Sequence, residues 1–348
     1  SSAASDVYKR QGIDIGSKTI KVVELVGQPG SFALKAAGAV SYSGNPLEKI
    51  NSEKEASDFS EVLRKLLKDV KVTGKRVNIS VPETSVFTRL MKFPPLTDEE
   101  IASAVKWESE ELIPMPIADA IVRHTIIERQ ESVNPPQVLV QLVAVHRLIV
   151  EKYVAACESV GLEVASVENE MSAVSRVLEN EKGVSVVLDV GSHATNIGIV
   201  KGGQVYVGRS VNAAGDSFSR AASLALGVSL VQAEQYKTAY GLSEDQLEGK
   251  IAQALLPVVR LLVDDIRKTV QSYSLDVKGE PPQNLILAGG SAGMAGLSTA
   301  LAAQTGMNVS VVNPFTTAKV ALEPTSASSL APFAPVYACA VGLGIRKE

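Results

Sequence analysis

Apolar residues recur along the chain in short runs and in stretches where they are spaced three or four positions apart. The short runs predict strands at 12–16, 19–26 and 32–42, and the wider spacing predicts an amphipathic helix at 53–70. A further apolar run at 77–81 predicts a buried strand. The first part of the chain is therefore predicted to be an α/β unit that opens with a three-strand meander.

A smaller module is predicted between residues 83 and 164. Thr97 and Glu100 have the spacing of a capping box before a helix expected at 98–112. Two strands follow, and then a helix that ends at Gly161. This order of strand, helix, strand, strand and helix indicates a module inserted into the first half.

The second half repeats the opening of the first. Apolar runs at 184–188 and 197–200 flank a turn, and a third strand is predicted at 204–210. The remaining elements predicted are strands at 162–167, 284–287 and 309–312, and helices at 168–178, 217–226, 229–240, 253–275, 297–305 and 335–345.

One turn sequence occurs in both halves. Residues 12–23 are GIDIGSKTIKVV, and residues 186–200 are VVLDVGSHATNIGIV. Asp14 and Asp189 hold the same place in the two copies, 175 positions apart. Each copy predicts a β-hairpin. Two copies predict a duplicated fold with two hairpins that face one phosphate chain.

The composition of these turns suits phosphate. Gly16 and Gly191 let backbone N–H groups approach phosphate oxygens closely. Asp14 and Asp189 cannot contact phosphate directly because like charges repel. They are expected to hold a hydrated Mg²⁺, which usually keeps several of its waters.

Other side chains of the turns would add donors. Ser17 and Thr195 supply hydroxyl groups, and either Lys21 or Lys18 supplies a positive charge. A third piece, the loop AGGSAG at 288–293, follows a buried strand and would let a base or ribose lie against the backbone. Glycine-rich loops are also typical of ordinary turns. Three such pieces in this order favour a nucleotide site.

Bulk composition limits the alternatives. A chain of 348 residues with 45% hydrophobic content predicts about two globular domains. A net charge of −4 gives no electrostatic case for binding nucleic acid. Cys157 and Cys339 are expected to be buried free thiols. No apolar run reaches 18 residues, so no transmembrane helix is expected and the chain is predicted to be cytoplasmic. Residues 1–11 resemble a truncated or foreign leader and are left out of the functional reasoning.

The order Asp14-x-Gly16, Asp189-x-Gly191 and the 289–290 glycine pair resembles the actin, Hsp70 and sugar-kinase ATPase superfamily. Within it, residues 12–346 are similar to the PilM family of type IV pilus assembly proteins. The matching segments are GIDIGSKTIKVVEL at 12–25, Trp107-Glu108 with LIPMP at 112–116, AEQYK at 233–237 and YACAVGLGIR at 337–346.

The resemblance implies a duplicated actin-like (ribonuclease H-like) α/β fold of two domains with an inserted FtsA/PilM-type subdomain. Subdomain 1A would comprise 12–82 and 165–182. The inserted subdomain 1C would comprise 83–164. The second actin-like domain, 2A/2B, would comprise 183–348.

The resemblance also implies a set of ATP-binding residues. Lys21 is preferred to Lys18 because its seven-residue offset from the aspartate matches actin-like hairpins. The first hairpin would contribute Asp14, Gly16, Ser17 and Lys21, the second Asp189, Gly191, Thr195 and Asn196, and the nucleoside end Glu234, Lys237, Gly289, Gly290 and Ser291, with Met294 nearby.

Several of these residues have two interpretations. Glu170 stands where actin-like ATPases keep a water-orienting residue, and it is equally typical of an exposed helix start. Glu234 and Lys237 share a helix face, which also suits a surface ion pair. His193 is expected to be an exposed turn residue. His124 and His146 lack the neighbours of a metal site.

By resemblance, the chain would bind ATP with Mg²⁺ and use it to set an interdomain angle, with at most slow hydrolysis. Its inserted module would bind the N-terminal cytoplasmic tail of a PilN-like inner-membrane protein, so membrane contact would come through that partner. Trp107, Ile113 and Pro114 are candidates near such a groove, although core packing is favoured for Trp107. A superfamily sugar or metabolite kinase and an FtsA-like cell-division scaffold are the alternatives, and self-association stays open.

Overall fold

The computed structural model describes residues 9–28 and 30–347, which form two compact units. Unit 1 contains the described residues up to Pro82, Leu148–Asn180 and the residues from Val312 onward. Unit 2 contains Glu83–Arg147 and Glu181–Val311. Most of the predicted leader, residues 1–8, lies outside the described residues, whereas residues 9–11 begin the first strand.

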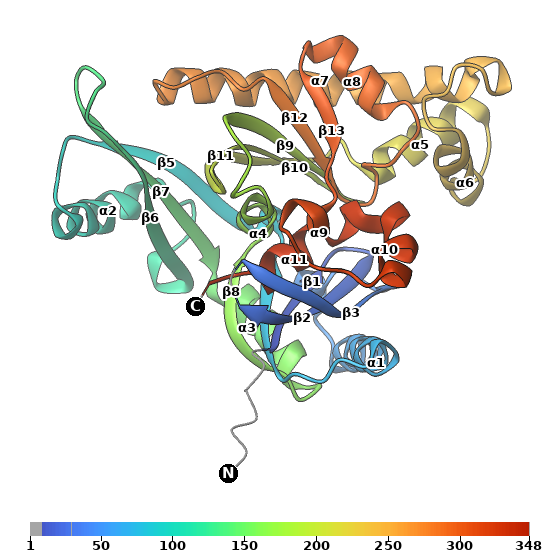
Figure 1. Ribbon diagram of the computed structural model, residues 1–348, viewed down its shortest axis with the longest axis horizontal. Coiled ribbons are helices and arrows are strands. Elements are labelled where there is room, and N and C mark those ends of the chain that lie inside the picture. Colours follow the sequence, from blue (N-terminus) through green and yellow to red (C-terminus); the bar gives the residue numbers. More distant parts are fainter. Residues whose placement is uncertain (1–8, 29, 348) are drawn as a thin grey trace. The chain divides into compact units, whose positions relative to one another are not determined.

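Unit 1 is built on a five-stranded sheet in the order β3-β2-β1-β4-β8 (Figure 1). The first three strands form an antiparallel meander, and β4 and β8 continue the sheet parallel to β1. The strands are β1 (Lys9–Ile15), β2 (Thr19–Gln28), β3 (Ser31–Ser41), β4 (Arg76–Val81) and β8 (Glu163–Asn169).

The helices of unit 1 cover this sheet. In α1 (Glu53–Val70), whose bounds match the prediction, the Ser52 side chain accepts the Glu55 N–H, and Phe59 and Leu63 are buried. Asn169 stands before the first residue of α4, because β8 continues two residues further than predicted. The other helices are α3 (Arg147–Glu158), α4 (Glu170–Val177), α9 (Pro314–Thr317), α10 (Pro324–Leu330) and α11 (Ala338–Gly344).

Helix α11 packs against β1 and α4 at very short range. A Cβ on Gly342 would stand 1.9 Å from the Ala173 carbonyl oxygen, and one on Gly12 would stand 2.0 Å from the Ala340 oxygen. Only glycine permits this approach. This packing joins residues 312–347 to unit 1, whereas the sequence analysis assigned them to the second domain. Residues 148–164 likewise group with unit 1 and not with the inserted module.

The segment Pro324–Gly344 is long and apolar enough to cross a membrane by length and composition. The sequence prediction counted only unbroken apolar runs and therefore passed over it. In the structure the segment is divided into α10, a 3₁₀ stretch at Ala331–Tyr337 and α11. Every residue of α11 is buried, which is typical of a core helix.

The main sheet of unit 2 has the order β11-β10-β9-β12-β13 and repeats the connectivity of the first sheet. Again a three-strand antiparallel meander is followed by two parallel strands. This confirms the predicted duplication. The strands are β9 (Val184–Val190), β10 (Thr195–Lys201), β11 (Gln204–Val211), β12 (Asn284–Ala288) and β13 (Asn308–Val311).

Four helices of unit 2 carry its largest core, with Phe218, Leu255 and Leu262 fully buried. They are α5 (Gly215–Leu226), α6 (Leu230–Tyr240), α7 (Lys250–Asp276) and α8 (Leu297–Thr305). Helix α5 begins two residues before its predicted start. Both Cys157 in unit 1 and Cys339 in α11 are buried free thiols, as predicted.

The inserted module, also in unit 2, is a three-stranded sheet in the order β5-β7-β6 covered by α2. Its elements are β5 (Val86–Phe93), α2 (Asp98–Leu112), β6 (Ala120–Gln130) and β7 (Gln137–His146). The predicted capping box of Thr97 and Glu100 is present. Trp107 is 80% exposed, so the prediction that it packs in the core is wrong, whereas Ile113 is only 6% exposed and belongs to the module's core.

Candidate functional site

The first hairpin joins β1 to β2 around a two-residue loop. The Gly16 N–H donates to the Thr19 carbonyl oxygen at 3.0 Å and closes the loop, in which Ser17 comes first. Asp14 pairs with Lys21 across the strands, and Lys21 Nζ donates to Asp14 Oδ2 at 2.9 Å. Both side chains are largely buried. Lys21 therefore carries a positive charge directly beside Asp14.

The second hairpin joins β9 to β10 with the same register. Gly191 N–H donates to the Ala194 carbonyl oxygen at 3.1 Å, and Asp189 pairs with Asn196 across the strands. Asn196 Oδ1 accepts from Ser210 Oγ at 3.0 Å. The duplication thus extends to single residues, with a lysine opposite the aspartate in one copy and an amide in the other.

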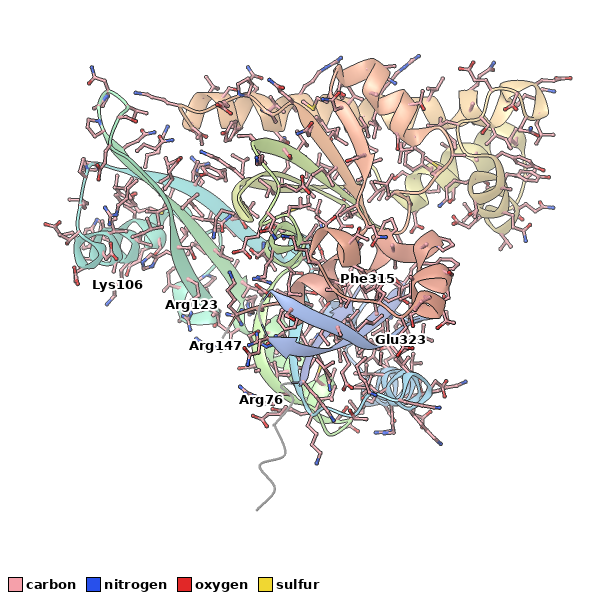
Figure 2. The ribbon with its side chains drawn as sticks, in the orientation of Figure 1. Arg76, Lys106, Arg123, Arg147, Phe315 and Glu323 are labelled. Atoms are coloured by element: carbon pink, nitrogen blue, oxygen red, sulfur yellow. The ribbon has the colours of Figure 1, made fainter. Side chains whose placement is uncertain are left out.

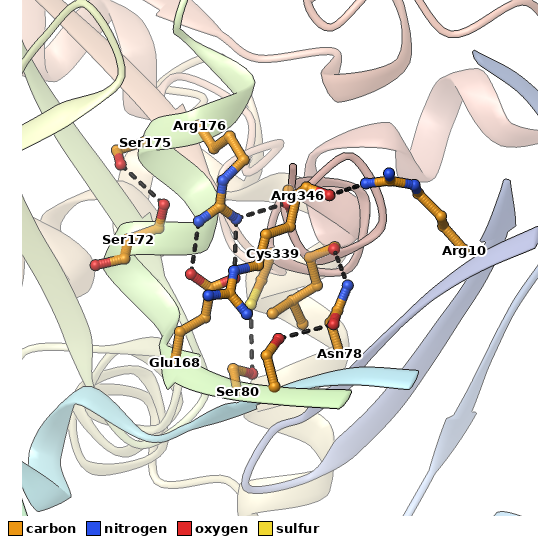
Figure 3. Close-up of polar contacts among 12 residues, drawn as sticks. Arg10, Asn78, Ser80, Glu168, Ser172, Ser175, Arg176, Cys339 and Arg346 are labelled. Carbon is orange, nitrogen blue, oxygen red and sulfur yellow. Dashed lines mark hydrogen bonds and ion pairs between the residues drawn. The ribbon is translucent and has the colours of Figure 1, made fainter. Parts of the chain in front are cut away.

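A row of polar side chains that begins at Ser80 beside Asp14 crosses the sheet of unit 1, and Figure 3 shows its part from Ser80 to Glu168 and Arg176. Ser80 of β4 donates to Asp14 Oδ1 at 3.4 Å, and Cys339 Sγ lies 3.4 Å from the Ser80 hydroxyl. Glu168, the register partner of Ser80 in β8, forms an ion pair of 2.6 Å with Arg176. Arg176 also donates to an α11 carbonyl oxygen at 2.8 Å. The row connects Asp14 to α11 through side chains that the sequence did not single out.

Glu170 begins α4 directly after β8. Burial raises the pKa of Tyr153 well above its ordinary value, and the negative charges of Glu48, Glu170 and Asp14 raise it further. The protonated Tyr153 hydroxyl donates to Glu48 Oε2 at 3.1 Å. Glu48 thus accepts directly from this hydroxyl, whereas Glu170 and Asp14 act on its pKa through their charge. The sequence offered no signal for Glu48.

The Gly289–Gly290 loop of unit 2 lies directly against the second hairpin. Ala288 pairs with Asp189, and Ser291 N–H donates to the Val190 carbonyl oxygen at 3.1 Å. Gly289 has φ +87°, and a Cβ there would stand 2.4 Å from Asp189 Oδ1. A Cβ on Gly290 would meet nothing within 4 Å. The loop is therefore tightly packed at one glycine and open at the next.

Glu234 and Lys237 of α6 form the ion pair that their spacing allows, at 2.8 Å. Glu234 lies at the surface, but Lys237 is buried, with only 7% of it exposed, so this is not an ordinary surface ion pair. Its Nζ also lies 3.3 Å from the Gly215 carbonyl oxygen at the start of α5. Thr195 Oγ1 donates to the Ala213 oxygen at 2.6 Å, so that hydroxyl holds the β11–α5 connection.

The start of α5 is the part of this site that the sequence missed. The N–H groups of Gly215 and Asp216 donate to the carbonyl oxygens of Gly191 and Ser192, which anchors the helix to the second hairpin. His193 is exposed, as predicted, and its Nδ1 lies 2.9 Å from Asp216 Oδ2. The available signal was the Gly-Asp pair directly before the helix predicted at 217–226.

A separate hollow of about 390 Å³ in unit 1 is lined by basic residues that include Arg76, Arg346 and Lys347. It lies at the beginnings of β1 and β4, whereas Asp14 and Ser80 lie toward the ends of these strands. It is therefore not part of the predicted phosphate site.

The donor set suits a magnesium nucleotide. Among residues 9–28 and 30–347, no three or more His, Cys, Asp or Glu side chains form a group that could hold a metal ion. Mg²⁺ does not need such a cage, since it is commonly bound by one or two carboxylates, waters and substrate phosphates. Asp14 and Asp189 fit that role in their respective units, and the open backbone at Gly290 fits an approaching ligand.

Comparison with known proteins gave a matching family model and a similar solved structure. The family model described as "Type IV pilus assembly protein PilM" matches residues 12–348. The solved structure of a PilM–PilN type IV pilus biogenesis complex aligns with a TM-score of 0.82 at 24% identity, covering 98% of this chain and 99% of that chain.

A more distant structure shares the fold, and a further protein is similar in sequence over part of the chain. MreB5 of Spiroplasma citri bound to AMPPNP aligns with a TM-score of 0.54 at 11% identity, covering 96% of this chain and 94% of that one. The ethanolamine utilization protein EutJ of Escherichia coli (strain K12) is 31% identical over 141 residues, which is 40% of this chain and 45% of that relative, less than half of its length. The two solved structures confirm the predicted actin-like two-domain fold.

We expect Gly289→Ala to destabilise the protein and Gly290→Ala to leave its stability nearly unchanged. Alanine at 289 would be strained at φ +87° and would displace Asp189, lowering the free energy of unfolding by about 1–3 kcal/mol. Alanine at 290 meets open space, so a change within about 0.5 kcal/mol is expected. Urea unfolding without nucleotide measures both, and equal stability of the two variants would contradict the packing described.

Proposed function

The chain belongs to the family of the type IV pilus assembly protein PilM, and we propose on that basis that it is an ATP-binding, cytoplasmic component of the pilus assembly machinery. In this proposal it binds ATP with Mg²⁺ and binds the N-terminal cytoplasmic tail of a PilN-like inner-membrane protein. Its position at the inner membrane then comes from that partner.

The shared register of the two hairpins carries the proposal of ATP binding. Each has a carboxylate seven positions before a polar side chain, a glycine that closes the turn and a two-residue loop. Backbone N–H groups of such loops suit phosphate oxygens. The MreB5 structure, which was solved with AMPPNP, is a further support because it shares the fold.

We assign the polar side chains of the site as follows. Lys21 would leave its pairing with Asp14 to neutralise phosphate, and Asp14 and Asp189 would bind Mg²⁺ through water. Mg²⁺, when bound, would neutralise phosphate charge and polarise the terminal phosphoryl group. The remaining phosphate contacts are Gly16, Ser17, Gly191, Thr195 and Asn196, and the nucleoside contacts are Glu234, Lys237, Gly289, Gly290 and Ser291.

Glu170 is the residue we assign to orienting water for hydrolysis. Its negative charge is one of the causes that raise the pKa of the Tyr153 hydroxyl. A carboxylate can accept a proton from water but gives no positive charge to a departing phosphate. We therefore propose that turnover is slow and that the main role of ATP is to change the affinity for the tail.

The inserted module offers a strand edge for the tail. Strand β6 pairs only with β7 among the described residues, and its middle residues Arg123, His124 and Thr125 are exposed. An extended peptide gains main-chain hydrogen bonds when it adds to such an edge. Figure 2 labels Arg123 on this strand. The tail is therefore proposed to add to β6 as a fourth strand.

We expect Lys21→Gln to weaken the binding of MgATP by about 10- to 100-fold, because a charged donor to phosphate is lost. Lys18→Gln, in the same hairpin, is the matched control, with an expected change of less than about twofold. Isothermal titration calorimetry with MgATP measures both affinities. A greater loss in the Lys18 variant would reverse the assignment of the phosphate-binding lysine.

We expect the tail peptide to protect the amides of β6 from hydrogen exchange, since strand addition occupies its free edge. The N-terminal peptide of the PilN-like partner would be added with and without MgATP, followed by exchange measured at Ala120–Gln130 and, as a control, at Glu53–Val70 in α1. Protection should be confined to the β6 peptide and change with ATP. Equal effects of a scrambled peptide would refute the docking site.

A further inference from the structure

Helix α2 of the inserted module turns one side to its sheet and the other to solvent. Ile101 and Val105 are buried in the module's core. At 100° per residue, Trp107 points away from those two residues, and it is 80% exposed. Figure 2 labels its neighbour Lys106 on the same helix. The single tryptophan of the chain thus stands on the outer side of α2.

Such exposure is costly for an indole. Tryptophan buries a large apolar area where it packs, and it is the residue type most enriched among the energetic centres of protein interfaces. The helix itself does not need it, since its cap and its buried face are complete without Trp107. The residue is therefore best explained by a contact that the isolated chain does not make.

The surroundings of Trp107 are strongly acidic. Glu100, Glu110 and Glu111 lie within about 60° of it around the helix, and all three are exposed. The whole helix carries six carboxylates and one lysine in 15 residues. The formal charge of the complete chain is only −4. Negative charge is thus concentrated on this face and not spread evenly over the surface.

We propose that this face, defined by Glu100, Ser103, Trp107, Glu110 and Glu111, docks a basic protein segment. The partner would present an apolar slot for the indole, with lysine or arginine side chains at the rim to pair with the glutamates. An aromatic centre with a charged rim is the usual layout of a specific interface. Anionic lipid surfaces and nucleic acids carry the wrong charge for it.

This surface is separate from the edge proposed for the tail. The tail would add to β6 in the plane of the sheet, whereas α2 covers a face of that sheet with Trp107 on its far side. The inference needs neither ATP nor the tail. A failure of tail binding or of ATP binding would therefore leave it standing, and its own failure would leave them standing.

The sole tryptophan makes the test direct. The probe is an amphipathic helical peptide of lysine and leucine, with a glutamate–leucine peptide of the same pattern as its counterpart. Addition of the first to the full chain should shift the Trp107 emission to the blue and saturate, with affinity that falls as salt is raised. The second should cause no shift. An unchanged spectrum with the lysine peptide would overturn the proposal.

Variants separate a specific surface from general attraction. Anisotropy of a labelled lysine–leucine peptide should show binding weakened by roughly tenfold or more in Trp107→Ala and in Glu110→Gln/Glu111→Gln. The matched control, Glu53→Gln/Glu61→Gln, removes two exposed carboxylates from α1 and should bind as the parent chain does. Equal losses in both double variants would reduce the binding to net charge and contradict the proposal.

A second copy of the chain is the competing occupant. Analytical ultracentrifugation of the chain without peptide measures its oligomeric state and decides between a basic partner and a second copy. A monomer whose tryptophan emission is independent of concentration agrees with a basic partner. A dimer that dissociates on Trp107→Ala would assign the face to self-association and overturn the partner proposed here.

Discussion

The buried contact between Asp14 and Lys21 is the interaction on which the account of unit 1 depends. A carboxylate at the end of a central strand must keep its charge to bind a cation, and burial opposes that charge. The lysine across the hairpin at 2.9 Å compensates it, and the Ser80 hydroxyl at 3.4 Å adds a neutral donor. The same lysine is positioned to meet phosphate. The aspartate and its counter-charge thus form a site that a magnesium nucleotide could enter by exchanging partners.

In the second hairpin the residue paired with the aspartate is not a lysine. Asn196 stands where Lys21 stands in the first copy, and its amide oxygen is held by Ser210. The Gly289 loop and the start of α5 pack on this hairpin. Duplicated turns have therefore diverged in charge while keeping their register.

The hairpins and the ends of several helices could be predicted from the sequence because they depend on residues close together in the chain. The Asp-x-Gly turns with flanking apolar runs determine hairpin register, and the caps and spacing of α1 and α2 determine their bounds. What failed depends on contacts distant in sequence. Glu168 belongs to a strand because Ser80 pairs with it, and Lys237 is buried because α5 reaches it. Trp107 was expected in the core of the inserted module, but it lies on the outer side of α2 and is exposed.

The assignment of α11 shows the same limit. Its small residues are visible in the sequence, but only the packing shows that glycines on both sides let it lie on β1. The segment follows the second domain in the sequence and was therefore predicted to belong to it. Its contacts instead group it with unit 1. The proposal of ATP binding rests on the duplicated turns, each of which is proposed to contribute phosphate contacts. Calorimetric titration of MgATP into Asp14→Asn, Asp189→Asn and the double variant tests it most directly. The account predicts one ATP per chain, weaker binding in each single variant, and a double variant whose loss differs from the sum of the two. Two sites per chain, or a single variant that binds as the parent does, would contradict it.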